Sequence, residues 1–254
     1  MILSTLLLVT LVFLSLPSSA EAADFRTGSE VNIGPEETVD DDLYVTGGTI
    51  NVDGTVNGDL VAAGGTINIR GSINGDVVAA GGTIMVNGMV RDSVRASGGT
   101  IVISSAVAGD VVVGAGRVEL APGSSVGRDV VIGAGNVHID GNVGRDVRLG
   151  AGAAVINGTV AGTVEADLGN RLTLGPMARI ESDLILTSPQ EASVAQGATV
   201  VGNTAYEKPT TSLFWVSVRD TAAIRVVEHF VQGAVVPGHR PGRATAVVDC
   251  AQDT

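Results

Sequence analysis

The sequence predicts an all-β protein whose central part is a single-stranded parallel β-helix. Three observations predict this fold: a repeat of 17 residues, apolar residues that alternate with polar ones inside each repeat, and glycine pairs at a fixed place in each unit. Residues 58–69 and 75–86 show the period directly, because both contain Val-Ala-Ala-Gly-Gly-Thr-Ile after a Gly-Asp pair. Units this short bury their apolar side chains only by stacking on one another.

The first 23 residues form a separate segment. Residues 2–16 are almost all apolar, and small residues follow up to residue 23. This order is typical of an export signal, cleaved here after Ala20, Ala22 or Ala23. The alternative is an uncleaved N-terminal anchor, although the stretch is short for a span of about 20 residues. Both interpretations predict an exported protein at the cell envelope or outside the cell, and the anchor would associate it with a membrane.

We assign residues 24–204 to the β-helix, with repeats readable from about residue 31 to residue 200. Five positions per repeat are apolar in every unit, and they lie two apart along short stretches, which is the period of a strand. We expect three short strands per coil and about nine coils, stacked about 4.8 Å apart. Corners such as Gly64-Gly65 suit a positive φ or close backbone approach. The first apolar position holds Leu43, Leu60, Val77, Val94, Val111, Val130, Val147, Val164 and Leu184.

Two repeats are longer than 17 residues. The aspartate that precedes the first apolar position recurs after 19 residues between Asp110 and Asp129, and the same position recurs after 20 residues between Thr163 and Asp183. Pro122 and Pro176 fall inside these longer units, where an inserted corner needs no ladder donor. We therefore expect two corner loops that project from the β-helix.

The composition excludes several functions. The chain has 27 acidic and 15 basic residues and a formal net charge of −12, which disfavours binding to nucleic acid. Its single cysteine, Cys250, has no partner for a disulfide. His138 is the only histidine in the repeats, so a zinc site with several histidines or a general-base cluster is not expected. We predict no enzyme, no catalytic, cofactor-binding or metal residues, no cofactor and no small-molecule substrate.

A column of aspartates is the most conspicuous polar feature. One interpretation is a ladder of carboxylates that binds Ca²⁺. The interpretation we favour is structural: each aspartate caps its turn by accepting a backbone N–H two residues on, a role that Ser93 and Thr163 would also fill. The column consists of Asp42, Asp59, Asp76, Asp110, Asp129, Asp146 and Asp183.

The repeated Val-x-Gly-Asp-Val/Leu-x-x-x-Gly-Gly-x-Ile/Val-x-Ile-x-Gly phrase resembles the bactofilins, a family of polymer-forming cytoskeletal proteins, over residues 31–203. The resemblance implies a right-handed β-helix that polymerises end to end with itself, without nucleotide, near membranes. The export signal places the chain with the exported branch of such proteins. The expected polymer-end residues are Leu184, Leu186, Val194 and Val200.

The two ends of the β-helix differ in charge. The first coil carries Glu36, Glu37, Asp40, Asp41 and Asp42, and charge at a terminal coil opposes edge-to-edge addition. We therefore hypothesise that the N-terminal end is capped and that assembly runs through the C-terminal end.

The repeat phrase stops at residue 205. Residues 205–254 are either a tail whose short amphipathic helix, at 217–232, covers the last coil, or a disordered remnant. We expect a structural scaffold that self-assembles at the cell envelope. The alternative is a monomeric secreted β-solenoid, an adhesin or surface-layer spacer, that binds a partner through its corner loops.

Overall fold

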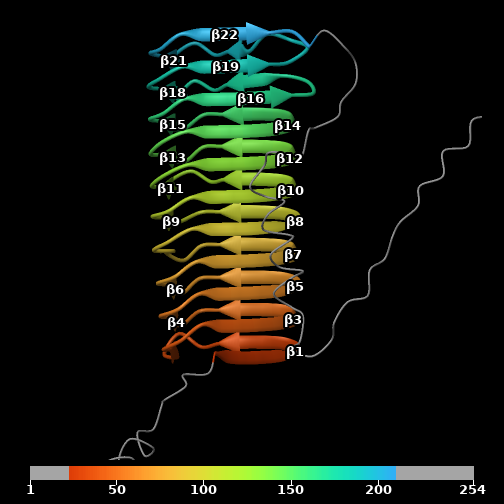
Figure 1. Ribbon diagram of the computed structural model, residues 1–254, viewed down its shortest axis with the longest axis vertical. Helices are drawn as coiled ribbons and strands as arrows, with labels where there is room; N and C mark the ends of the chain where they lie inside the picture. Colours follow the sequence, from red (N-terminus) through yellow and green to blue (C-terminus); the bar gives the residue numbers. More distant parts are fainter. Residues whose placement is uncertain (1–22, 210–254) are drawn as a thin grey trace, which may run out of the picture. The chain divides into compact units, whose positions relative to one another are not determined.

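A computed structural model describes residues 23–209 (Figure 1). The export signal or anchor and the expected amphipathic helix at 217–232 lie outside these residues. Every regular element between residues 23 and 209 is a β-strand, and every strand pair is parallel. The predicted parallel β-solenoid is therefore confirmed.

The coils stack through one continuous ladder, with Leu60 aligned on Val77 and so on along the chain. Eleven strands follow one another in this ladder, so the structure has about eleven coils rather than the nine expected. Two further strands, β17 (Leu172–Leu174) and β20 (Ser193–Val194), continue the coils of β16 and β19. The ladder strands are β1 (Asp24–Ile33), β3 (Leu43–Val52), β5 (Leu60–Ile69), β7 (Val77–Val86), β8 (Val94–Ile103), β10 (Val111–Leu120), β12 (Val130–Ile139), β14 (Val147–Ile156), β16 (Val164–Leu168), β19 (Leu184–Thr187) and β22 (Thr204–Glu207).

A second row of two-residue strands forms the opposite side of the coils. These strands make one three-stranded and one six-stranded sheet, and Val90 bridges the two. Most coils thus have one long and one short strand instead of the three short strands expected. The first two expected strands form one continuous strand, because the ladder pairs residues on both sides of the glycine pair. The short strands are β2 (Thr38–Val39), β4 (Thr55–Val56), β6 (Ser72–Ile73), β9 (Ala106–Val107), β11 (Ser125–Val126), β13 (Asn142–Val143), β15 (Thr159–Val160), β18 (Arg179–Ile180) and β21 (Thr199–Val200).

The two additional coils lie at the ends. The sequence pattern missed β1 because Asp24 and Arg26 occupy positions that are apolar in later coils, where they align with Leu43 and Val45. The pattern also missed β22 for a similar reason, because Thr204 occupies a position that is apolar in earlier coils. The last strand runs to Glu207, three residues past the expected boundary at 204.

The core consists of the predicted columns of apolar side chains, from Leu43 to Leu184 in the first column. The glycine corners between them owe their glycines to close approach rather than to positive φ. A Cβ on Gly81 would lie 2.6 Å from the carbonyl oxygen of Gly64 in the preceding coil. Among residues 23–209, positive φ occurs only at Gly123 and Gly197.

Both expected corner loops are present as tight turns. Ser124 donates its N–H to the Ala121 carbonyl across Pro122, and Ala178 donates to Gly175 across Pro176. The same turn also appears twice more, with Glu37 donating to Gly34 and Ala198 donating to Ala195.

Candidate assembly surfaces

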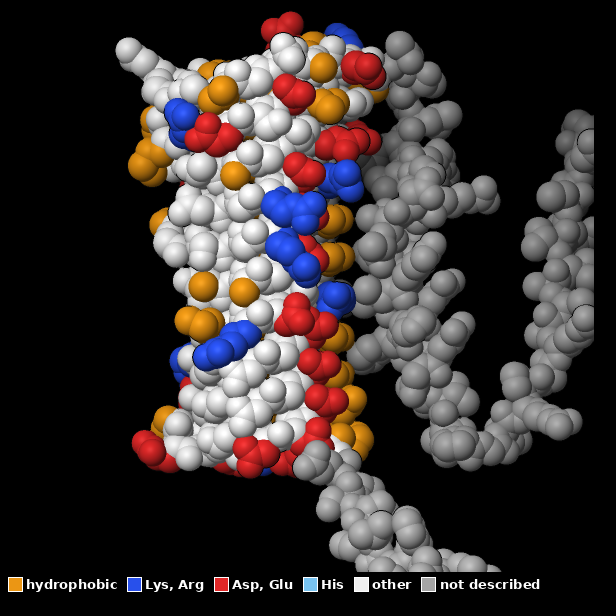
Figure 2. All heavy atoms as spheres, turned by 60° about the vertical axis from the view of Figure 1, so that its left-hand side comes forward, with side chains coloured by type: hydrophobic (Ala, Val, Ile, Leu, Met, Phe, Trp, Pro, Cys, Tyr) orange, Lys and Arg blue, Asp and Glu red, His pale blue; other side chains and the backbone are white. Residues whose placement is uncertain are grey.

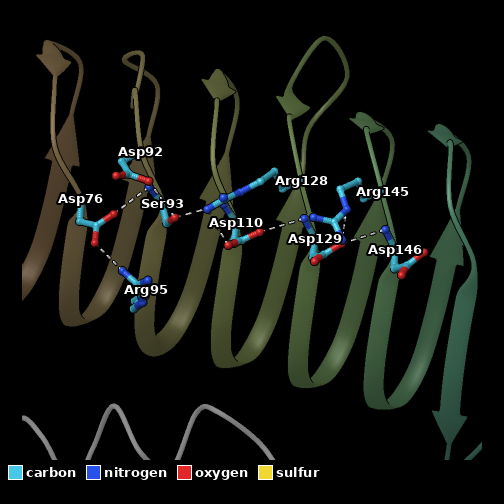
Figure 3. A network of polar contacts seen from close by, with 9 residues as sticks. All are labelled: Asp76, Asp92, Ser93, Arg95, Asp110, Arg128, Asp129, Arg145 and Asp146. Carbon is cyan, nitrogen blue, oxygen red and sulfur yellow. Dashed lines mark hydrogen bonds and ion pairs between the residues drawn. The ribbon is translucent and has the colours of Figure 1, made fainter.

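The aspartate column links neighbouring coils (Figure 3). The Asp76 Oδ1 accepts the backbone N–H of Ser93 at 2.9 Å, and the Ser93 hydroxyl oxygen accepts the N–H of Asp110 at 3.2 Å. Asp146 accepts the N–H of Thr163 at 2.8 Å in the same way. The expected bond to an N–H two residues on was therefore wrong, because the acceptor reaches the next coil. The same coil-to-coil bond is made by Asp42, Asp59, Asp110, Asp129 and Asp183.

Three arginines neutralise part of this column. Arg95 donates to the Asp76 Oδ2 at 2.6 Å, and Arg128 donates to the Asp110 Oδ2 at 2.9 Å (Figure 3). Arg145 lies 3.5 Å from an oxygen of Asp129. These pairs lie on coils four to eight of the ladder, whereas Asp42 and Asp59 have no arginine partner among residues 23–209.

The described residues bring no group of potential metal ligands together. No cluster of three potential metal ligands occurs between residues 23 and 209. His138 lies on the outer side of β12, between the buried Val137 and Ile139. The Ca²⁺ interpretation of the aspartate column therefore has no geometric support in this part of the chain.

Charged side chains lie across the N-terminal end of the core. Arg26 donates to the Asp24 carboxylate at 2.7 Å and forms an ion pair with Glu37 at 2.6 Å. The hydrogen bond from Arg26 lowers the pKa of Asp24, so the pair weakens only as the pH falls through that lowered value. Two other acids support this coil: Asp40 accepts from the Asn57 amide at 2.9 Å and Asp41 from the Asp42 N–H at 2.8 Å.

The C-terminal end is different, because no described strand pairs with the outer edge of β22. In each coil the N–H of the first column residue donates to the next coil, as Val77 does to Ser93 at 2.9 Å and Leu184 does to Asn203 at 2.9 Å. Thr204 occupies this position in β22, so its N–H points toward the open edge.

The four expected end residues divide into two groups. Leu184 and Leu186 are buried beneath β22 and do not reach the end surface. Val194 is 58% exposed and Val200 is half-buried, and both stay at the end together with the half-buried Tyr206.

Besides the two ends, the structure has a third candidate assembly surface, which was not predicted from the sequence. One outward-facing column of the long strands is mostly apolar, and it begins with Phe25 stacked on Tyr44 at a ring-centroid distance of 4.9 Å. Figure 2 shows hydrophobic side chains in a line along one edge, with acidic groups beside its N-terminal part and basic groups further up. The signal was present as apolar residues one position after the first column. The column continues through Glu165, Ile185 and Ala205 on the last three coils. We call its part on the first eight coils the stripe: Phe25, Tyr44, Val61, Val78, Arg95, Val112, Val131 and Arg148.

Comparison with known proteins finds no match to a family model, a curated protein or a solved structure. Among residues 23–209 there is no helix long and apolar enough to cross a membrane. The candidate surfaces must therefore be interpreted from their own geometry.

Proposed function

We propose that this protein is a structural scaffold that self-assembles end to end, without nucleotide, into filaments or patches at the cell envelope. The observation that carries the proposal is the outer edge of β22, which no strand among residues 23–209 pairs with and where the N–H of Thr204 faces outward beside Val194 and Val200. An unpaired strand edge is a template for another chain. The resemblance to bactofilins in the repeat phrase supports the same function.

The two ends are unequal, which bears on how assembly proceeds. Arg26, Asp24 and Glu37 place charge over the N-terminal columns, and an incoming apolar end would have to desolvate them. Assembly through the C-terminal ends alone joins two chains by a two-fold axis and then stops. Longer assemblies therefore require a second contact.

The alternative function is a monomeric secreted β-solenoid that acts as an adhesin or surface-layer spacer. The observation that favours it is the turn at Pro176, whose neighbour Met177 is 70% exposed. A projecting apolar residue at a corner suits contact with a partner protein.

The two functions are separated by a substitution at the open edge. Thr204→Pro removes the outward N–H, and proline is tolerated at sheet edges. Thr204→Val is the matched control, because it keeps the N–H and changes only the side chain. We expect the unaltered chain and Thr204→Val to sediment as assemblies and Thr204→Pro to sediment as single chains, with circular dichroism unchanged.

Negative-stain electron microscopy of the same three proteins completes the test. End-joined assemblies from the first two proteins and separate rods from Thr204→Pro would support the scaffold. Separate rods from all three proteins, at every concentration, would refute it and favour the spacer.

A further inference from the structure

The stripe combines outward-facing apolar side chains, most of them half-buried, with an uneven distribution of charge. Six of its eight residues are apolar, and Phe25 is 75% exposed. The corner beside its first four coils carries five carboxylates and no arginine: Asp40, Asp41, Asp42, Asp59 and Asp76. The stripe and corner of the next four coils carry five arginines against four carboxylates: Arg91, Arg95, Arg128, Arg145 and Arg148 against Asp92, Asp110, Asp129 and Asp146.

We propose that the stripe is a lateral interface that binds a second copy of this chain in antiparallel orientation. A two-fold axis across the stripe lays the acidic half of each copy on the arginine-bearing half of the other. It also keeps the corner beside the stripe of one copy opposite the same corner of its partner, so Asp40, Asp41 and Asp42 of the second coil face the seventh-coil corner that carries Arg128 and Asp129. Such an interface is self-complementary and closes after two chains.

The register that matches the two halves pairs the first coil with the eighth. In this register β1 lies opposite β14 of the second copy, β3 opposite β12, β5 opposite β10, and β7 opposite β8. Phe25 then faces Arg148, which forms an ion pair with Glu165 of its own chain at 3.3 Å, and Val61 faces Val112. A parallel two-fold arrangement would instead place each stripe residue opposite its own copy, so Arg95 would face Arg95 and Arg148 would face Arg148.

The acidic flank favours a second copy over a lipid surface, because anionic headgroups would be repelled by the carboxylates beside the apolar half of the stripe. Eight coils give a contact about 35 Å long, which is narrow for a lone stable dimer. The contact becomes effective when chains are already joined at their C-terminal ends, since linked contacts reinforce one another. In this respect the inference rests on the proposed function, and it supplies the second contact that longer assemblies require.

A matched pair of substitutions tests the interface in the full chain. Val61→Asp places a charge in the stripe, and Val102→Asp places the same charge on another outward column of the long strands, where Val102 is equally half-buried. We expect Val61→Asp to weaken lateral pairing about tenfold or more, because the charge would be buried without a partner. Val102→Asp should pair like the unaltered chain.

The readout is the width of the particles in electron microscopy, together with sedimentation velocity. Double-width particles from the unaltered chain and Val102→Asp, and single-width particles from Val61→Asp, would support the proposal. Single-width particles from all three proteins would overturn it. The proposal would also be overturned if the unaltered chain bound phosphatidylglycerol vesicles and formed no double-width particles. The stripe would then be a lipid-binding surface.

Thiol cross-linking tests the orientation in a Cys250→Ser background. With a short bismaleimide, the Val61→Cys, Val112→Cys double variant should form covalent dimers, whereas either single variant should not. Efficient cross-linking of Val61→Cys alone would indicate parallel pairing and overturn the antiparallel proposal.

Failure of the lateral interface and failure of end-to-end assembly would give different particles. Short double-width particles from Thr204→Pro would support the lateral interface even without end-to-end assembly. Long single-width filaments of the unaltered chain would support end-to-end assembly and refute the lateral interface.

Discussion

At the corner that carries the aspartate column, the carboxylate of each aspartate takes the place of a backbone carbonyl. It accepts the N–H of the corresponding residue in the next coil. The preceding residue is often glycine because the carboxylate of the coil below occupies the space of its side chain, as a Cβ on Gly58 would lie 2.5 Å from the Asp42 Oδ1. In two coils an arginine takes the place of this glycine and bonds to the previous coil. Arg128 and Arg145 do so by ion pairs with Asp110 and Asp129.

Substitutions at Asp146 test this role. Asp146→Ala leaves the N–H of Thr163 without its acceptor at 2.8 Å, so we expect the free energy of unfolding to fall by about 1–2 kcal/mol. Asp146→Asn keeps the acceptor oxygen and should cost less than half as much. Urea unfolding followed by circular dichroism measures both. Equal losses in the two variants would show that charge, rather than the hydrogen bond, is what the fold uses.

The glycine corners are coupled to the next apolar column. Beside Gly64 and Gly81 the inward residue of the preceding coil is isoleucine, and its Cδ1 lies 3.1–3.3 Å from the position that a Cβ on the glycine would take. In later coils the corner holds alanine, as at Ala134, where the inward residue of the preceding coil is Val118. The smaller column residue leaves room there for the Cβ at the corner.

Two alanine substitutions separate glycines that are sterically required from those that are not. Gly81→Ala would force a Cβ to 2.6 Å from the Gly64 oxygen, so we expect a loss of about 1–3 kcal/mol in unfolding free energy. Gly133→Ala meets nothing within 4 Å and has no positive φ, so it should be neutral or stabilise by about 0.4–1 kcal/mol. Thermal unfolding of both variants decides the point, and a similar loss at Gly133 would contradict it.

At the level of elements, the four Pro- or Gly-containing turns are one device used at one corner. They add two residues after the fourth apolar column without disturbing the ladder on either side, so Leu120 still aligns with Ile139. The second long repeat also gains a residue at its glycine corner, where Leu172 follows Val164 by eight positions, whereas Ile67 follows Leu60 by seven. That extra residue explains its spacing of 20.

Deleting residues 122–123 tests whether the turn is needed for folding. The remaining Leu-Ala-Ser-Ser-Val would match Ile-Ser-Ser-Ala-Val at residues 103–107 of the coil below, with Ser125 already aligned on Ala106. We expect the unfolding free energy to change by less than about 0.5 kcal/mol. Deleting residues 131–132 instead removes a buried column residue and should cost about 3 kcal/mol or more. A comparable loss from both deletions would mean that the turn contributes to stability.

For the whole molecule, the sequence was sufficient for the period, the columns and the parallel stacking, because each apolar column repeats with a constant register. It was insufficient for the terminal coils, where columns end against solvent and residues such as Asp24 and Thr204 need not be apolar. The coil-to-coil bond of Asp76 was also beyond it, because sequence spacing cannot distinguish an acceptor aimed along a turn from one aimed across coils. The stripe was overlooked since its valines looked like ordinary outward residues.

The charged N-terminal end gives the last prediction. Replacing Asp24 and Arg26 with valine would extend the first two apolar columns, which continue through Leu43 and Val45, to the end of the β-helix. We expect this double variant to assemble at about tenfold lower concentration, because joining that end no longer desolvates an ion pair. The control is the Asp53→Val, Arg70→Val variant, which removes a pair with the same 2.6 Å closest approach as Arg26 and Glu37 but on the side of the coils. Pelleting by ultracentrifugation over a concentration series measures the threshold. If the threshold is the same in both variants, or falls equally in both, the charges do not cap this end.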